Sequence, residues 1–159
     1  MNSLALEALS GELLRQRKWR LATAESCTGG LIAHRLTNVP GSSDYYLGGI
    51  VAYSNEVKMN QLNVSADTLG HYGAVSRETV IEMARGVRAA LQADVGLSVS
   101  GIAGPGGGSS DKPVGLVWIG LIAPGYELAN RYLWGGDRLQ VKEQSAEQAL
   151  IMLVEFLQR

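Results

Sequence analysis

The segment from 95 to 103 constrains the fold more than any other part of this chain. It is a continuous, largely apolar run without a charged residue, and the sequence GPGGG at 104–108 ends it abruptly. A strand of this kind is buried on both faces of a sheet, whereas a strand with one solvated face alternates apolar and polar residues. Helices from elsewhere in the chain must therefore cover both faces.

Helical and strand patterns alternate along the rest of the sequence. The expected elements are a helix containing Leu6, Leu9 and Leu13, strands at 19–24 and 46–53, a helix at 28–37, and a hairpin of strands at 115–123 and 128–134 that turns at Pro124-Gly125. Such alternation is typical of layered α/β domains, and the hairpin adds antiparallel strands. We therefore expect an α/β fold, a three-layer α/β/α sandwich with a mixed, mostly buried sheet. At 159 residues the chain is long enough for one domain, expected to span 1–159.

Two further helices carry clear start signals. Ser76 is a good N-cap for a helix whose apolar stripe extends to Leu91, and Val75 before it can pack against Val80. Asp137 caps the last helix, and Gln140 three residues later completes a capping box. These signals place both helix starts from sequence alone.

Composition excludes several kinds of partner. A formal net charge of -1 and a pI near 6.1 provide no field that would gather nucleic acid. No apolar run approaches the ~18 residues that a membrane span requires, and the first 20 residues lack the pattern of a signal peptide. The lone Cys27 rules out an internal disulfide and fits a reducing compartment. We expect a cytoplasmic protein that binds neither nucleic acid nor membrane.

The sequence ESCTGG at 25–30 lies where a strand ends and a helix begins. Open α/β sheets bind ligands at such carboxyl ends, which makes the hydroxyl of Ser26 a candidate nucleophile. The competing interpretation is that Ser26 or Thr28 merely caps the helix, and local spacing gives the two about equal weight. Cys27 is a second candidate nucleophile, although a lone thiol is more often a buried small side chain.

The base that would activate Ser26 is not a histidine in any recognisable pattern. His34 falls inside a predicted helix and His71 in a predicted loop, so a Ser/His/Asp triad is not indicated. Tyr53 and Lys58 follow the second strand, and a desolvated lysine beside a phenol can accept a serine proton. Taken alone, the two residues favour an interfacial tyrosine and a solvated lysine over a catalytic pair by roughly two to one.

Glycine-rich segments are the candidates for phosphate binding. The loop that begins at Gly104 can turn backbone N–H groups and hydroxyls toward a phosphate, and Arg138 can reach an anion at the start of the last helix. Ser109 and Lys112 share the Ser-x-x-Lys spacing of some serine enzymes, but the glycines before them and Pro113 after them argue against a helix. No metal-ligand pattern is visible, so neither a metal nor another cofactor is expected.

Taken together, six motifs closely resemble the CinA carboxy-terminal domain family over nearly the whole chain. They are AESCTGG at 24–30, VPGSS at 39–43, YSNEVK at 53–58, GAVS at 73–76, GIAGPGGG at 101–108 and KPVG at 112–115. The chain is similar to the stand-alone members of that family known as nicotinamide-nucleotide amidohydrolases. The resemblance implies an α/β/α fold, no metal, homodimers or larger assemblies, and the conversion of nicotinamide mononucleotide and water to nicotinate mononucleotide and ammonia.

By resemblance, Ser26 is the nucleophile, and Tyr53 and Lys58 are its activating partners. Backbone N–H groups near Thr28, Gly29 and Gly30 are the expected oxyanion donors. The remaining residues expected to bind substrate are Ser42, Ser43, Gly104, Gly106, Gly107, Gly108, Ser109 and Arg138.

Two positions depart from the family pattern. Ser100 stands where threonine is expected, and Lys142 stands where arginine is expected. Larger relatives carry an extra amino-terminal domain, which is not expected here because the chain begins about 20 residues before the first predicted strand. Two alternatives remain open: an amidase for another small amide, and a non-catalytic nucleotide-binding or regulatory paralogue.

Overall fold

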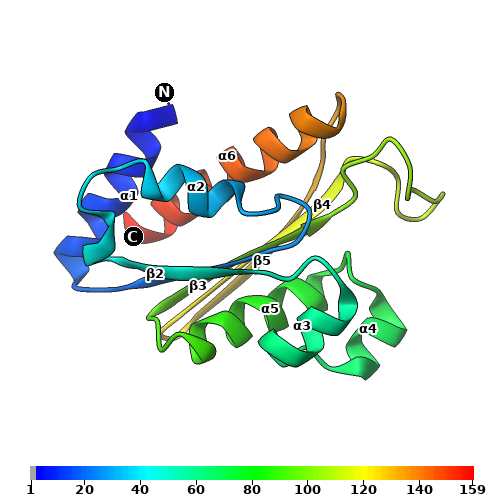
Figure 1. Ribbon diagram of the computed structural model, residues 1–159, viewed down its shortest axis with the longest axis horizontal. Helices are drawn as coiled ribbons and strands as arrows, with labels where there is room; N and C mark the ends of the chain where they lie inside the picture. The colour runs from blue at the N-terminus through cyan, green and yellow to red at the C-terminus, as the bar shows by residue number, and fades with distance from the viewer. Residues whose placement is uncertain (1–2) are drawn as a thin grey trace.

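A five-stranded sheet organises the computed structural model, which describes residues 3–159 (Figure 1). The strands are β1 (Leu21–Glu25), β2 (Tyr46–Val51), β3 (Val95–Gly101), β4 (Leu116–Ala123) and β5 (Tyr126–Leu133). The helices are α1 (Ser3–Arg17), α2 (Leu31–Thr37), α3 (Asn55–Leu62), α4 (Ala66–Tyr72), α5 (Arg77–Ala90) and α6 (Arg138–Leu157), with a 3-10 turn, η1 (Ser42–Asp44). Residues 1 and 2 of the predicted 1–159 domain lie outside the described part.

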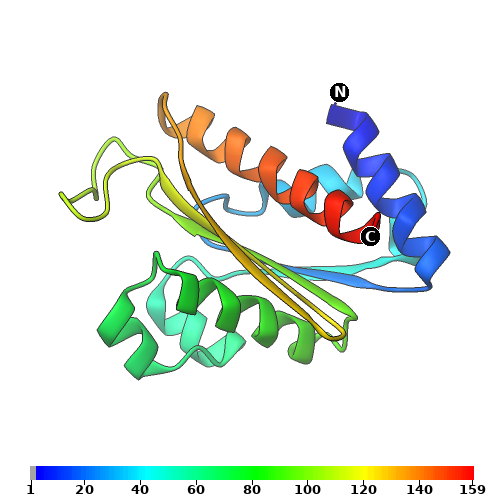
Figure 2. The ribbon, with the colours of Figure 1, turned by 180° about the vertical axis from the view of Figure 1, so that it is seen from behind.

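Helices cover both faces of the sheet, which confirms the predicted three-layer α/β/α architecture. Figures 1 and 2 show α1, α2 and α6 on one side and α3, α4 and α5 on the other. β3 lies in the middle, and all of its residues except Gly101 are buried. Its continuous apolar sequence therefore reflects contact with both helical layers.

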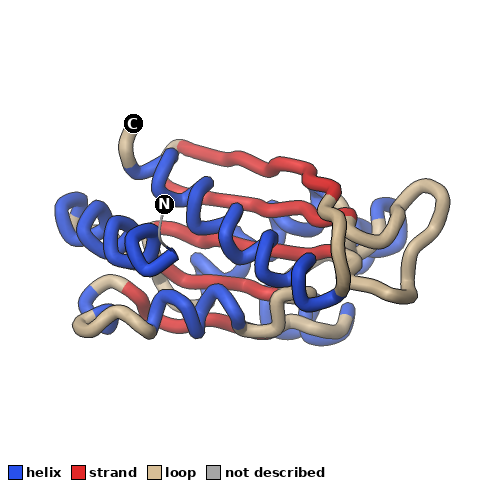
Figure 3. Tube along the Cα trace, turned by 90° about the horizontal axis from the view of Figure 1, so that it is seen from above, coloured by secondary structure: helices blue, strands red, loops and turns tan. Residues whose placement is uncertain are grey.

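The sheet is mixed, in the order β2-β1-β3-β4-β5. β1 pairs in parallel with β2 and β3, while β3, β4 and β5 pair antiparallel. Figure 3 shows the strands lying side by side in one sheet. The chain leaves β1 toward β2 on one side and later returns to β3 on the other. The carboxyl end of β1 is therefore a topological switch point, where open α/β sheets form a crevice.

Most predicted elements are confirmed within a few residues, including the hairpin at Pro124-Gly125. Ser76 accepts a hydrogen bond from the amide of Thr79, and Asp137 and Gln140 form the predicted capping box. The elements that sequence reasoning missed are α3 and α4. The prediction of His71 in a loop was wrong, since it lies in α4.

Helices α3 and α4 were not predicted because their sequences are largely polar. Both are short, with many exposed residues, so they lack the wide apolar stripe that marks α5. Their N-caps were the available signal: Ser54 accepts from the amide of Val57, and Ser65 accepts from the amide of Asp67. The helix from Asn55 determines where Lys58 points.

Candidate functional site

A cavity of about 330 Å³ opens at the carboxyl ends of β1 and β3. This volume falls within the range of about 300–1,000 Å³ typical of small-molecule sites. Its lining residues come from the ends of β1 and β3, the glycine-rich loop after β3, the segment after β2, α3, the loop before α5 and the start of α6. They are Ser26, Cys27, Tyr53, Asn55, Lys58, Ala74, Val75, Ser100, Gly101, Ile102, Ala103, Gly104, Gly106, Gly107 and Arg138. Segments far apart in sequence thus meet at the topological switch point of the sheet.

The turn that presents Ser26 is held by the buried carboxylate of Glu25. One carboxylate oxygen accepts from the hydroxyl of Thr28 at 2.6 Å and from the amide of Ile32 at 2.9 Å, and the other accepts from the amide of Ala33 at 3.0 Å. Glu25 therefore satisfies free N–H groups in the first turn of α2, where a negative charge is favourable. The sequence shows Glu25 next to Ser26, but this capping role was not predicted from it.

Thr28 serves this capping network, whereas Ser26 does not. Gly30 occupies the N-cap position of α2 and makes no side-chain cap hydrogen bond. The amide of Ser26 donates to the carbonyl of Val99 at 2.9 Å, which fixes the residue just beyond the paired part of β1. Ser26 lines the cavity, and its hydroxyl oxygen accepts a hydrogen bond from Lys58 rather than from an amide of α2. The helix-capping alternative for Ser26 is therefore not what the geometry supports.

Lys58 lies beside that hydroxyl in a nearly solvent-free position. Its side chain is 1% exposed, and its Nζ lies 3.0 Å from Ser26 Oγ and 2.9 Å from the carbonyl oxygen of Ala52. Burial lowers the pKa of the Lys58 amine from its ordinary value. The interpretation of Lys58 as a solvated lysine was therefore wrong. Because α3 begins at Asn55, its first turn carries Lys58 inward.

Cys27 is poorly suited to the role of rival nucleophile. The thiol is buried, and burial raises its pKa to about 12. The thiolate is the reactive form of cysteine, so a group that stays protonated near neutral pH is a weak nucleophile.

Tyr53 lines the same cavity but contacts Arg138 rather than Lys58. One guanidinium N–H donates to the Tyr53 hydroxyl oxygen at 2.8 Å, and another donates to the carbonyl of Gly104 at 2.9 Å. Tyr53 is 60% exposed. Among the described residues, no hydrogen bond joins its phenol directly to Ser26 or Lys58. Arg138 thus links the end of β2 to the glycine-rich loop across the cavity mouth.

The predicted oxyanion segment borders a neighbouring cavity. Thr28, Gly29 and Gly30 line a second space of about 350 Å³, together with His34 and Lys142 among others. The amide of Gly29 donates to the carbonyl of Ser26 at 3.0 Å, so that N–H is already engaged in the turn. Thr28, Gly29 and Gly30 therefore line a different cavity from Gly104, Gly106, Gly107 and Arg138.

Ser42 and Ser43 lie at the other end of the parallel strands. They form η1, just before β2 begins, whereas Ser26 follows the carboxyl end of β1. Neither residue lines the cavity, so the expectation that they hold a ligand beside Ser26 is corrected. The physical reason is the β-α-β connection: α2 carries the chain back to the amino edge of the sheet before the next parallel strand.

The glycine-rich loop contributes only its first part to the cavity. Gly104, Gly106 and Gly107 line it, whereas Gly108 and Ser109 do not. Gly108 instead packs against Val114, where an added Cβ would lie 2.8 Å from the backbone nitrogen. The expected absence of a helix at 109–112 is confirmed.

Sequence analysis missed several lining residues. Ser100 was noted only as a departure from the family pattern, yet its hydroxyl donates to the carbonyl of Ala74 at 2.8 Å and joins β3 to the loop before α5. Asn55 lies three residues before Lys58 on α3, and the Ser54 N-cap could have revealed this helix.

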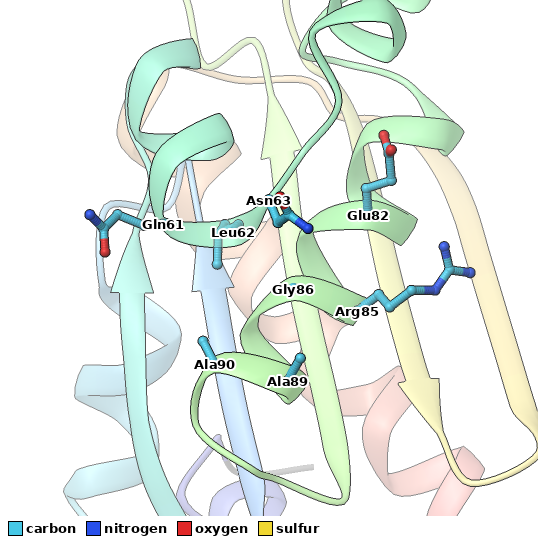
Figure 4. Close-up of a pocket in the computed structure, with 8 residues that line it drawn as sticks. All are labelled: Gln61, Leu62, Asn63, Glu82, Arg85, Gly86, Ala89 and Ala90. Atoms are coloured by element: carbon cyan, nitrogen blue, oxygen red, sulfur yellow. The ribbon is translucent and has the colours of Figure 1, made fainter.

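A larger groove of about 670 Å³ lies between α3 and α5 (Figure 4). Its lining residues are Gln61, Leu62, Asn63, Glu82, Arg85, Gly86, Ala89 and Ala90. At Gly86 the two helices approach so closely that an added Cβ would lie 1.9 Å from the carbonyl oxygen of Leu62. The groove offers neither a serine nor a buried lysine.

Across residues 3–159, no helix combines the length and apolar character needed to cross a membrane. The same part of the chain holds no cluster of three or more histidine, cysteine, aspartate or glutamate side chains placed to bind a metal ion.

The fold and the site together define a class: an α/β/α protein with a buried serine–lysine pair at the switch point of its sheet. A neutral amine 3.0 Å from a hydroxyl can accept its proton, which is the first requirement of a serine nucleophile.

The chain belongs to the CinA C-terminal domain family, whose model matches residues 3–157. It is 39% identical to the competence damage-inducible protein A of Klebsiella pneumoniae, whose crystal structure superposes with a TM-score of 0.96 over 100% of this chain and 99% of that one. The competence/damage inducible protein CihA of Agrobacterium tumefaciens is 39% identical, with a TM-score of 0.90 over 97% of this chain and 96% of that one.

Sequence relatives include a CinA-like protein of Desulforapulum autotrophicum, 52% identical over 148 residues, which make up 92% of this chain and 35% of the relative. A CinA-like protein of Salinibacter ruber is 50% identical over 147 residues, 92% of this chain and 36% of that protein. The chain thus spans about a third of the length of these sequence relatives.

Proposed function

We propose that this protein is a nicotinamide-nucleotide amidohydrolase that converts nicotinamide mononucleotide and water to nicotinate mononucleotide and ammonia. The observation that carries an acyl-transfer reaction is the 3.0 Å contact between Lys58 Nζ and Ser26 Oγ in a buried position. The choice of nicotinamide mononucleotide rests on the motifs shared with stand-alone members of the family.

The first half-reaction forms an ester on Ser26. Neutral Lys58 removes the hydroxyl proton while Ser26 Oγ attacks the carboxamide carbon. The tetrahedral intermediate collapses when its C–N bond breaks, and the protonated Lys58 returns the proton so that nitrogen leaves as ammonia. A lowered lysine pKa assists both transfers, because the amine is available as a base and its ammonium form gives up the proton readily.

The second half-reaction returns the free enzyme. A water molecule gives a proton to Lys58 and attacks the ester carbonyl, and the Ser26 oxygen leaves with that proton. The products are a carboxylic acid, which ionises to nicotinate mononucleotide, and the original serine hydroxyl. Atoms and charge therefore balance without a metal or an oxidant.

Binding groups around the pair are proposed to orient the amide. Tyr53 and Arg138 lie at the cavity mouth, and the Tyr53 hydroxyl is held by the guanidinium, so its own proton is available for a substrate oxygen. Backbone amides of the first part of the glycine-rich loop, at Gly106 and Gly107, are the proposed contacts for phosphate. Lys142 lines the neighbouring cavity together with the turn of Thr28 to Gly30 and Glu143.

The same proposal covers the setting of the reaction. A pyridine-nucleotide substrate and a single buried cysteine suit the cytoplasm, where the enzyme would serve nucleotide recycling. We propose a homodimer or larger homo-oligomer and no nucleic-acid or membrane partner. Sedimentation of the purified protein measures the assembly directly.

Ammonia release provides the test. Purified protein is incubated with nicotinamide mononucleotide without added metal, alongside Ser26→Ala and the matched variant Cys27→Ala. We expect turnover by wild type and by Cys27→Ala, no turnover by Ser26→Ala, and an acyl-enzyme on Ser26 detectable by intact mass. Turnover that survives in Ser26→Ala contradicts the mechanism.

Other outcomes distinguish the alternatives. Nucleotide binding without ammonia would favour a non-catalytic regulatory module. Ammonia from another small amide, with none from nicotinamide mononucleotide, would retain the serine–lysine chemistry and replace the substrate.

A further inference from the structure

Two irregular segments form much of the wall around Ser26, and contacts outside the sheet hold them. The segment 73–76 precedes α5, and the glycine-rich loop, defined as 104–115, follows β3. The first segment is fixed from two sides: Ser76 and Thr79 hydroxyls donate to the carbonyl of Gly73 at 3.0 and 2.7 Å, and Ser100 binds the carbonyl of Ala74. It therefore provides a rigid wall.

The base of the glycine-rich loop is also fixed. The amide of Gly115 donates to the carbonyl of Ile102 at 2.8 Å, and the amide of Ile102 donates to the carbonyl of Leu116 at 2.9 Å. Arg138 binds the carbonyl of Gly104. Figures 1 and 2 show the rest of the loop projecting beyond the sheet, and residues 105–111 are exposed.

Lys112 connects this projecting part to the opposite wall. A local turn holds its backbone: the amide of Ser109 donates to the carbonyl of Lys112 at 2.8 Å, and the amide of Lys112 donates to the hydroxyl of Ser109 at 3.1 Å. Its ammonium donates to the carbonyl of Tyr72 in the last turn of α4. Helix carbonyls at that end carry partial negative charge, which favours a cation.

Gly73 makes room for this contact. An added Cβ at Gly73 would lie 2.9 Å from Lys112 Nζ, and its φ of +77° lies in the region that favours glycine. Among hydrogen bonds of the described residues, the Lys112–Tyr72 contact alone joins 105–112 to α4 or the segment after it. The ammonium thus closes a bridge between the two walls.

We propose that Lys112 is a positioning residue that clasps the glycine-rich loop to the end of α4 and so sets the shape of the cavity in which substrate binds. This inference rests on the proposed function, because the clasp acts on substrate through the loop. Lys112 does not line the cavity, so its removal should weaken binding and leave chemistry at saturation nearly unchanged.

The kinetic test compares Lys112→Ala, Lys112→Met and Lys112→Arg, with Asp111→Ala on the same exposed loop as the matched control. With nicotinamide mononucleotide we expect KM to rise about tenfold in Lys112→Ala and Lys112→Met, with kcat changed less than about twofold, as loss of one charge-assisted hydrogen bond predicts. Lys112→Arg keeps a cation at this position, so its KM should stay close to that of wild type. The KM of Asp111→Ala should equal that of wild type. An unchanged KM in Lys112→Ala, or a fall in kcat alone, overturns the proposal.

Hydrogen exchange separates failure of the clasp from failure of the proposed function. In Lys112→Ala and Lys112→Met, amides of 105–112 should exchange faster than in wild type, and Lys112→Arg should reverse the change. Unchanged exchange overturns the clasp even if wild type releases no ammonia. If Lys112→Ala exchanges faster than wild type but wild type releases no ammonia, the clasp is supported. The missing turnover then refutes only the proposed amidohydrolase activity.

Discussion

The cavity at Ser26 and the groove between α3 and α5 are built from neighbouring parts of one fold but differ in chemistry. The groove is about twice as large, at about 670 Å³ against about 330 Å³. Its walls are small residues and exposed polar side chains of two helices. The smaller cavity is lined by a buried lysine, a serine and a hydrogen-bonded tyrosine–arginine pair, which come from separate segments of the chain.

Desolvation of a charged group, rather than cavity volume, distinguishes the candidate site from the groove. Removing Lys58 from water costs free energy that the fold must offset elsewhere, and the lowered pKa records this cost. The groove has a structural explanation instead: Gly86 lets α5 pack directly on the carboxyl end of α3, the helix that carries Lys58. The groove thus supports the cavity through packing.

The largest expected effect is at the lysine. Lys58→Met keeps the length of the side chain and removes the base, so kcat for ammonia release should fall about 10³-fold. The double variant Lys58→Met/Met59→Lys is the control, because it moves the amine to the next position of α3. Its turnover should stay as low as that of Lys58→Met. If Lys58→Met retains turnover within about tenfold of wild type, Lys58 is not the general base.

The second effect is on the pH dependence. Burial lowers the Lys58 pKa below its ordinary value of 10.5, and only the neutral amine accepts the Ser26 proton. On the acid side, kcat/KM should rise about tenfold per pH unit and level off above the lowered pKa. The unfolded chain binds the extra proton between the lowered pKa and 10.5, so the free energy of unfolding should rise with pH across that interval. A rate that falls as pH increases toward the lowered pKa would contradict this assignment.

A third, smaller effect concerns the cavity mouth. Arg138→Met removes the donors to the Tyr53 hydroxyl and the Gly104 carbonyl, and kcat/KM should fall about tenfold to 100-fold, as loss of charged hydrogen bonds predicts. Arg131→Met on β5 is the matched control. Steady-state kinetics provide the measurement. If kcat/KM of Arg138→Met equals that of Arg131→Met, Arg138 has no role in substrate binding or turnover.

The smallest effect on turnover is expected from filling the groove. Ala89→Gln places a larger side chain on an exposed position of α5 and should change kcat/KM less than about twofold, since surface substitutions of this kind perturb stability little. Gly86→Ala, by contrast, should lower the free energy of unfolding by about 1–3 kcal/mol in chemical denaturation, because its Cβ meets the Leu62 carbonyl. A strong loss of activity in Ala89→Gln would make the groove a functional site.

Much of the architecture follows from local pattern. The apolar run of β3 required helices on both faces, and caps at Ser76 and Asp137 placed the starts of α5 and α6. Helices α3 and α4 were not predicted from the sequence, because short polar helices lack a periodic apolar stripe. Ser26, Tyr53 and Lys58 line one cavity, whereas Ser42 and Ser43 lie away from it, because proximity in sequence to α2 does not reveal which edge of the sheet a loop occupies.

The layered α/β architecture, the position of Ser26 at a strand-to-helix turn and the family can all be predicted from the chain's residues, because hydrophobic period, capping and ordered motifs are local properties. Which polar residues meet cannot be predicted in this way. Burial of Lys58 against Ser26, the link from Arg138 to Tyr53, and the division of the glycines between two cavities depend on how distant segments pack. A lysine becomes a base through loss of water, and that loss is a property of the assembled fold.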